Sequence, residues 1–239
     1  MRKLLPISTV TLLTFFSFIL YIFPNMFLNT EAEENKNAET TNITPAPAIE
    51  KEIIVLDAGH GGYDGGSLSK NNIKEADISL ALALKTGKIL ENNGYKVIYT
   101  RTSDEVSWES DNVQDLNARI QTGENGNADY FISLHLNFGE SYNDGARGFE
   151  IYLDYEDKTI INMAEKLEEN LTKLNYSIDR GLKSTKDFPL QVIDCNKVPA
   201  MLIEIGFLSD DKDTKYITSQ NGQDNISQTI ADSIMTTLS

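Results

Sequence analysis

Short apolar runs alternate with longer stretches of helical period along most of this chain, and this alternation restricts the folds that it can adopt. The runs are continuous, which is typical of strands covered on both faces; they span residues 52–57, 95–100, 130–134, 148–153 and 200–205. Helical periodicity marks residues 73–92, a helix that starts within 116–121, and residues 158–174 and 225–238. This order predicts an α/β fold with a single domain, in which a mostly parallel central sheet is flanked by helices on both faces.

The helix at 73–92 carries small and apolar residues at helical spacing, and they predict its buried stripe. The members of this stripe are Ala76, Leu80, Ala83, Leu84, Gly87 and Leu90.

Composition excludes some classes of function. The chain has 239 residues and a formal net charge of -15, so a phosphate backbone would be repelled and nucleic acid is not an expected partner. Its single cysteine, Cys195, permits no intrachain disulfide. A catalytic thiol at this position is disfavoured, because no recognisable nucleophile motif surrounds it.

The N-terminal segment has the features of a targeting sequence. Arg2 and Lys3 precede an uncharged stretch, residues 4–28, that is long enough to cross a bilayer. We interpret residues 1–28 as a signal peptide or an N-terminal membrane anchor, and residues 29–49 as a polar linker. The folded domain is then expected over residues 50–239, exported to the outer side of the membrane, with membrane contact only through the N-terminal segment.

The only two histidines of the chain, His60 and His135, each lie at the end of an apolar run, beside a loop that contains glycine or asparagine. Ligands of α/β folds bind beyond the carboxyl ends of the strands, so both imidazoles are expected to share one site. A metal is the usual reason for such an arrangement, and a catalytic zinc takes three protein ligands. Cys195 is a weak candidate for the third ligand, whereas Glu75 is well placed at the start of a helix.

Glu75 has an alternative interpretation that the sequence leaves open. The segment 72–75, Asn-Ile-Lys-Glu, fits a capping box in which Glu75 only caps its helix. The glycines at positions 59, 61, 62, 65 and 66 lack the spacing of a dinucleotide fold or a phosphate loop. They are expected to let the backbone turn tightly around a metal ligand.

Glu204 interrupts the apolar run Ala-Met-Leu-Ile-Glu-Ile-Gly-Phe of residues 200–207. A carboxylate inside a buried run is unfavourable unless it is paired or takes part in chemistry, and the alternative is that it faces a solvated side of the sheet. Near a metal-activated water it would serve as a general base and then as an acid toward the leaving amine.

Five motifs together closely resemble the zinc-dependent N-acetylmuramoyl-L-alanine amidases of the Amidase_3 type. They are Leu-Asp-Ala-Gly-His-Gly-Gly with His60, Glu-Ala-Asp-Ile-Ser-Leu with Glu75, Thr-Arg-Thr-Ser-Asp at 100–104, Phe-Ile-Ser-Leu-His-Leu-Asn with His135, and Leu-Ile-Glu-Ile-Gly-Phe-Leu-Ser with Glu204. The resemblance extends from about residue 53 to the C-terminus.

The resemblance implies a zinc ion held by His60, Glu75 and His135, with Glu204 as the catalytic carboxylate. It also implies a substrate, peptidoglycan, whose amide between N-acetylmuramic acid and L-alanine is hydrolysed by a zinc-activated water. Asn137 matches a position that contacts substrate or shapes the loop. The chain departs from the family pattern at two further positions, with Ala76 in place of lysine and Asp210 in place of asparagine.

Arg101 matches a family position too, and a structural ion-pair role explains it equally well. Two rival functions stay open at this point: a zinc carboxypeptidase-like wall peptidase, and an inactive wall-binding or regulatory module of the same fold. The resemblance is compatible with an activating or regulatory protein partner, and with a role in sporulation, germination or ordinary wall turnover.

Overall fold

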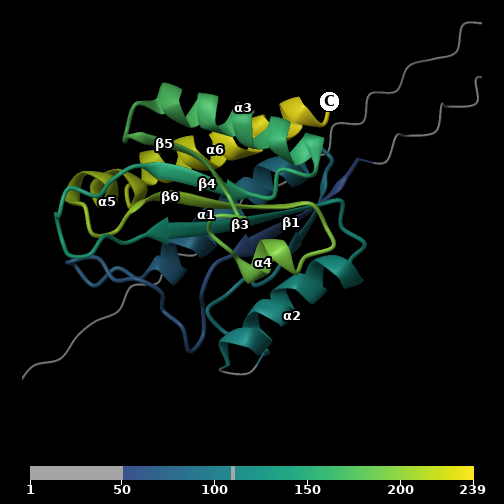
Figure 1. The fold of residues 1–239 in the computed structure, drawn as a ribbon, viewed down its shortest axis with the longest axis horizontal. Helices are drawn as coiled ribbons and strands as arrows, with labels where there is room; N and C mark the ends of the chain where they lie inside the picture. Colours follow the sequence, from purple (N-terminus) through teal and green to yellow (C-terminus); the bar gives the residue numbers. More distant parts are fainter. Residues whose placement is uncertain (1–50, 109–110) are drawn as a thin grey trace, which may run out of the picture. The chain divides into compact units, whose positions relative to one another are not determined.

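The computed structural model describes residues 51–108 and 111–239, and these residues form an α/β unit (Figure 1). The targeting segment and the linker predicted over residues 1–49 lie outside the described residues and stay predictions. Among the residues that are described, no helix is both long and apolar enough to cross a bilayer.

A six-stranded sheet forms the centre of this unit. Its strands are β1 (Ile53–Ala58), β2 (Lys96–Tyr99), β3 (Tyr130–Asn137), β4 (Phe149–Leu153), β5 (Asp179–Ser184) and β6 (Ala200–Phe207). They lie in the order β2-β1-β3-β6-β4-β5, and every neighbouring pair is parallel except β4 and β6. The predicted single, mostly parallel sheet is therefore confirmed.

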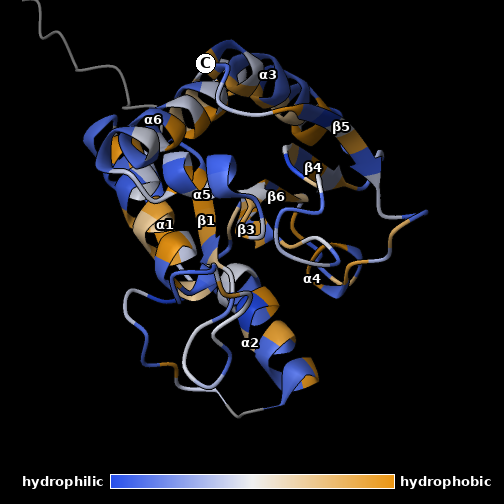
Figure 2. Ribbon diagram, turned by 90° about the vertical axis from the view of Figure 1, so that its left-hand side faces the viewer, coloured by the Kyte–Doolittle hydropathy of each residue, from blue (hydrophilic) through white to orange (hydrophobic). Residues whose placement is uncertain are grey.

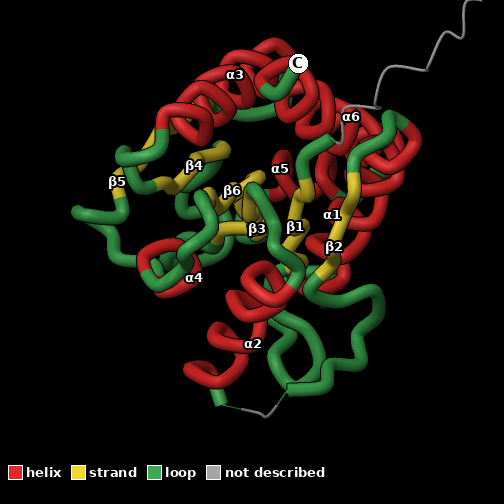
Figure 3. The backbone as a smooth tube through the Cα atoms, turned by 90° about the vertical axis from the view of Figure 1, so that its right-hand side faces the viewer, coloured by secondary structure: helices red, strands yellow, loops and turns green. Residues whose placement is uncertain are grey.

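Helices cover both faces of the sheet, as Figure 3 shows. They are α1 (Glu75–Asn92), α2 (Asn112–Asn125), α3 (Lys158–Leu174), α4 (Gln191–Asp194), α5 (Asp211–Ile217) and α6 (Gln220–Thr237). One face packs against α1, α3, α5 and α6 and buries the larger apolar cluster. The other face packs against α2 and α4 and buries the smaller cluster. The hydropathy colouring of Figure 2 places the apolar sides of α1 and α3 toward the sheet.

The alternation of side chains along the strands determines where the polar residues point. Leu134 of β3 and Ile203 of β6 belong to the larger cluster. Their successors, His135 and Glu204, must therefore point to the opposite face, the one that carries α2 and α4. Near the carboxyl ends of β3 and β6, this face presents polar side chains.

The helix boundaries differ from the prediction where capping residues lie outside the apolar pattern. The helix predicted to start within 116–121 begins at Asn112, because Asp111 accepts hydrogen bonds from the first free backbone amides of α2. The terminal helix begins at Gln220 rather than at 225, with Ser219 as its cap. By contrast, α3 has the predicted bounds.

The predicted stripe on α1 is wrong in part. Leu80 and Leu84 are only partly buried, whereas Ile78, Leu82 and Thr86 are buried. The physical reason is that α1 lies between the sheet and α6, which widens its buried face beyond the stripe expected of a helix with one partner.

Candidate metal centre

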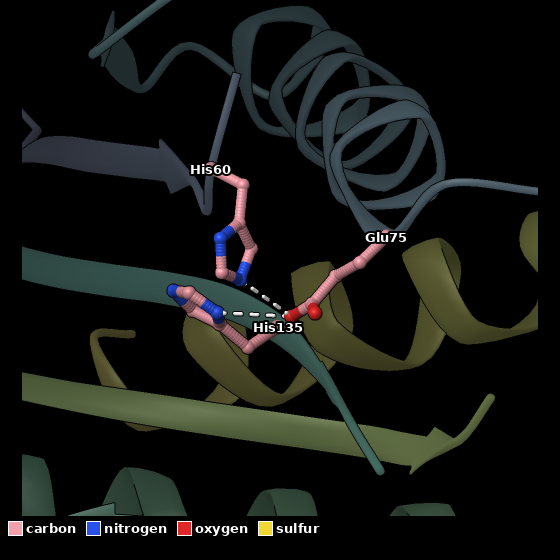
Figure 4. A group of neighbouring side chains, drawn as sticks. All are labelled: His60, Glu75 and His135. Carbon is pink, nitrogen blue, oxygen red and sulfur yellow. Dashed lines mark hydrogen bonds and ion pairs between the residues drawn. The ribbon is translucent and has the colours of Figure 1, made fainter. Parts of the chain in front are cut away.

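Three elements bring the predicted ligands together (Figure 4). His60 follows β1, Glu75 is the first residue of α1, and His135 lies in β3. One possible ligand atom from each residue lies within 4.8 Å of the other two. The carboxylate oxygen Glu75 Oε1 is 2.9 Å from His60 Nε2 and 3.1 Å from His135 Nδ1. The structure thus brings together the three residues that the sequence placed in one site.

Glu75 is held in position by two backbone amides. Its Oε1 accepts a hydrogen bond from the amide of Leu136 at 2.9 Å, and its Oε2 accepts one from Ser67 at 3.0 Å. Lys74 is the N-cap of α1 and makes no capping hydrogen bond with its side chain. Asn72 lies in a turn with a positive φ of 59°. The capping-box interpretation is therefore wrong, because Glu75 points to the histidines instead of capping its helix.

The ring of His60 is oriented by Asp64, which the sequence analysis did not single out. Asp64 Oδ2 lies 2.7 Å from Nδ1 of His60, and a hydrogen bond at one ring nitrogen fixes how the other is presented. Burial lowers the pKa of His60, but hydrogen bonds and charges from Glu75 and Asp64 outweigh this effect and raise the pKa to about 9. The spacing of four residues from His60 is the only signal that could have identified Asp64.

The carboxyl group of Glu75 is ionised at neutral pH, because its pKa is lowered. Burial raises its pKa, but hydrogen bonds from His135 and His60, together with the charges of both rings, hold that pKa well below the usual range. The centre therefore offers one carboxylate and two imidazoles, which is a donor set known from catalytic zinc sites. A Cβ atom added at Gly59 would lie 2.4 Å from the ring of His135, so this glycine leaves room for the imidazole. These residues fit a zinc ion.

Two buried arginines hold the loop that carries His60. Arg101 donates from Nε to the carbonyl of Ala58 at 2.9 Å and from Nη2 to that of Gly59 at 2.9 Å. Arg119 donates from Nη2 to the carbonyl of His60 at 2.8 Å and from Nη1 to Asp57 Oδ1 at 2.8 Å. Arg101 is thus structural, as one interpretation had it, but it acts through backbone carbonyls. Arg119, which the sequence analysis did not identify, forms the ion pair.

Glu204 lies beside His135, because the two residues are partners in the register of β3 and β6. Its Oε2 is buried and has no hydrogen-bond partner among the described residues. Burial, with the charges of Glu75 and Glu150 added, raises the pKa of this carboxyl group to about 7. The residue as a whole is partly exposed, but the buried and unpaired Oε2 differs from the carboxyl group of a freely solvated side chain, which was the alternative to a functional role.

Asn137 lies two residues after His135 and on the same face of β3. Its Nδ2 donates to Glu150 Oε1 at 2.8 Å, and its Oδ1 accepts from the amide of Phe138 at 2.8 Å. Glu150, in β4, is the register partner of Glu204 and is buried. The sequence analysis missed Glu150, although it interrupts an apolar run in the same way as Glu204.

Cys195 is exposed at the end of α4 and is not a member of the group of possible ligands. The weak alternative of a cysteine as third ligand is therefore wrong.

Comparisons with known proteins agree on one family. Residues 54–236 match the sequence pattern of Amidase_3, described as N-acetylmuramoyl-L-alanine amidase. The chain is 30% identical over 191 residues to YqiI, an uncharacterized protein of Bacillus subtilis, with 79% of this chain and 86% of that protein covered. It is 30% identical over 189 residues to the probable cell wall amidase LytH of Staphylococcus aureus, covering 78% of this chain and 58% of LytH.

Solved structures give the same result. The CwlD amidase of Clostridioides difficile, solved in complex with the GerS lipoprotein, superposes with a TM-score of 0.68 and 31% identity, covering 78% of this chain and 98% of CwlD. The catalytic domain of the amidase CwlV of Bacillus (Paenibacillus) polymyxa superposes with a TM-score of 0.67 and 29% identity, covering 77% of this chain and 97% of that one.

Proposed function

The chain belongs to the Amidase_3 family of N-acetylmuramoyl-L-alanine amidases, and we propose that it works with one zinc ion held by His60, Glu75 and His135 and with Glu204 as its catalytic carboxylate. As an enzyme of this family it hydrolyses the amide bond between N-acetylmuramic acid and the L-alanine of the peptidoglycan stem peptide.

The observation that carries the proposal is the position of Glu204 relative to the three candidate ligands. His135 is one of the three, and Glu204 is its partner in the register of the neighbouring strand. A buried carboxyl oxygen without a hydrogen-bond partner is unfavourable in a resting protein. It is suited to a group that forms its hydrogen bond only with an incoming water or substrate.

Each residue has a defined task in this mechanism. A bound zinc ion would polarise the scissile carbonyl group and make water more acidic. Asp64 holds the ring of His60, and the amides of Ser67 and Leu136 hold Glu75. Glu204 takes a proton from the attacking water on its carboxylate and passes it to the departing alanine nitrogen.

Metal analysis and product analysis together test this proposal. The purified full-length chain is expected to contain about one zinc per molecule and to lose both zinc and activity with a chelator. Mass spectrometry of digested peptidoglycan is expected to show new L-alanine N-termini. Shortened stems instead would identify the rival carboxypeptidase, and an unchanged digest from zinc-loaded protein would identify the inactive wall-binding module.

The place of action and the partners follow from the same chemistry. Peptidoglycan lies outside the cytoplasmic membrane, so we propose that the enzyme acts on the wall side of the membrane, either anchored or secreted. The complex of CwlD with a lipoprotein is a property of CwlD. A regulatory protein partner for the present chain stays a prediction.

A further inference from the structure

A row of charged side chains crosses the sheet at right angles to its strands, beginning at the candidate metal centre. His135 on β3 is the register partner of Glu204 on β6, and Glu204 is the partner of Glu150 on β4. Arg180 on β5 continues the row, because its Nε donates to Glu150 Oε2 at 2.9 Å. The row therefore extends from the place where the amide is cleaved to an arginine on the edge strand.

Arg180 presents free hydrogen-bond donors to a groove that begins beside Asn137. The two residues line this groove together with Glu150, Tyr152 and Phe207. The guanidinium carbon of Arg180 lies 4.9 Å from the centre of the Phe207 ring, which covers one face of the guanidinium group. Among the described residues, only Nε of this group has a hydrogen-bond partner, and 38% of the side chain is exposed.

Glu150 fixes the guanidinium group. This buried carboxylate accepts hydrogen bonds from Asn137, from Tyr152 Oη at 3.0 Å and from Arg180 Nε. A planar guanidinium that is held at Nε still has two terminal nitrogens, whose geometry suits the two oxygens of a carboxylate.

The surroundings of the groove favour one class of ligand. The chain carries a formal net charge of -15, and Glu140 and Asp144 also line the groove. Arg180 is the only cationic side chain among the residues that line it. An anionic group that enters from the metal centre therefore meets repulsion except at Arg180.

The distance from Glu204 to Arg180 fits a short peptide. Neighbouring strands lie about 4.8 Å apart, so the backbone at Arg180 is roughly 10 Å from that at Glu204. An extended peptide spans about 3.5 Å per residue, so with the leaving nitrogen at Glu204 the second or third residue after the cleaved bond would lie beside Arg180. We propose that Arg180 is a specificity-determining residue that binds a free carboxylate of the stem peptide, two or three residues beyond the scissile bond; this inference rests on the proposed function.

Matched substrates test the inference. N-acetylmuramoyl peptides would be compared in pairs that differ only in a carboxylate or a carboxamide at the second or at the third residue. For one of these pairs, the wild type is expected to cleave the acidic member with a kcat/KM about 10- to 100-fold higher, the range for hydrogen bonds to charged groups. R180Q is expected to reduce this preference to near one, mainly by raising KM for the acidic peptide.

Two further variants separate recognition from structure. R180K keeps the charge without the planar fork and is expected to keep only part of the preference. K186Q removes an exposed charge that follows the same strand and is expected to keep the whole preference. Zinc content and melting temperature would be measured for every variant, and calorimetry would compare binding of the acidic and amidated product peptides.

Two results would overturn the inference and leave the proposed function unaffected. One is a wild type that cleaves both members of every pair equally well. The other is an R180Q variant that loses kcat/KM equally for the acidic and the amidated peptide. Both results include amide cleavage and therefore leave the amidase activity in place. Failure of the zinc-loaded wild type to cleave any of these peptides or peptidoglycan would instead contradict the proposed function, and this inference with it.

Discussion

Gly59 gives the ring of His135 the space that it occupies in the candidate metal centre. A Cβ atom at this position would lie 2.4 Å from both Cε1 and Nε2 of His135. We expect Gly59→Ala to displace the imidazole and to lower zinc affinity by about 10- to 100-fold, as the loss of orienting contacts around metal ligands does. Zinc titration of the metal-free protein measures this change in zinc affinity.

Gly65→Ala is the matched control, because a Cβ there would meet only the side chain of Lys74, at 3.5 Å. Equal zinc affinity in both variants would show that the approach of Gly59 to His135 has no effect on the metal.

Glu204 is expected to act in turnover and not in metal binding. The Glu204→Gln variant keeps the shape of the side chain and removes the group that carries the proton. We expect turnover to fall by about 10²- to 10⁴-fold, the usual contribution of general acid–base catalysis, with zinc content unchanged. Glu165→Gln, at an exposed position of α3 on the other side of the sheet, is the control. Normal turnover in Glu204→Gln would remove this residue from the mechanism.

The sequence predicted which residues meet at the centre, but not the residues that support them. His60 and His135 could be paired because the carboxyl ends of parallel strands meet at one edge of a sheet. Asp64 could not be assigned, since its contact depends on a loop in which His60 has a positive φ of 60°. The partnership of Glu150 with Glu204 depends on the register between β4 and β6, which local sequence does not determine.

At the scale of elements, α5 and α6 approach each other closely at Gly222. A Cβ atom there would lie 2.0 Å from the backbone carbonyl oxygen of Tyr216, which cannot rotate away as a side chain would. Alanine gains about 1 kcal/mol of helix propensity over glycine, whereas overpacking costs about 1–3 kcal/mol. We expect the net effect of Gly222→Ala to be a destabilisation of up to about 2 kcal/mol in chemical unfolding.

Asn221→Ala is the control for this prediction, because it is exposed in the same turn of α6. A Gly222→Ala variant that is more stable than the wild type would show that α5 and α6 can move apart without loss of stability.

Elements without an apolar pattern of their own were the ones that sequence analysis missed. The edge strand β5 reads Asp-Arg-Gly-Leu-Lys-Ser and pairs only with β4, so it has neither the alternation nor the continuous run of a buried strand. The helices α4 and α5 are short, and only α5 begins at a side-chain cap. By contrast, α3 has its predicted bounds, because its apolar stripe from Ile160 to Leu171 extends over most of the helix.

At the scale of the whole unit, the layers were predictable and the strand order was not. Strand–helix alternation favours parallel neighbours, and it correctly predicted helices on both faces. The antiparallel pairing of β4 with β6 joins segments about fifty residues apart. Such long-range pairing is decided by packing of the assembled sheet, which no local pattern encodes.

The ion pair of Asp57 and Arg119 joins β1 to α2 and makes the stability of the whole unit depend on pH. Burial raises the pKa of Asp57, but the charge of Arg119 and hydrogen bonds from Ser133 and Thr100 prevail and lower it. A carboxyl group whose pKa is lower in the folded state stabilises that state above its unfolded pKa of about 3.9, and this stability is lost as the pH falls through the folded value.

We therefore expect metal-free Asp57→Asn to be about 3–5 kcal/mol less stable than the wild type at pH 7, the typical effect of breaking a buried ion pair. That difference should shrink as the pH falls below about 4, because Asp57 becomes protonated in the wild type. The effects of the other carboxyl groups are the same in both proteins and cancel in the difference. Urea unfolding across this pH range measures it, with the exposed Asp232→Asn as control; a difference that stays constant from pH 7 to pH 3 would show that the charge of Asp57 does not stabilise the fold.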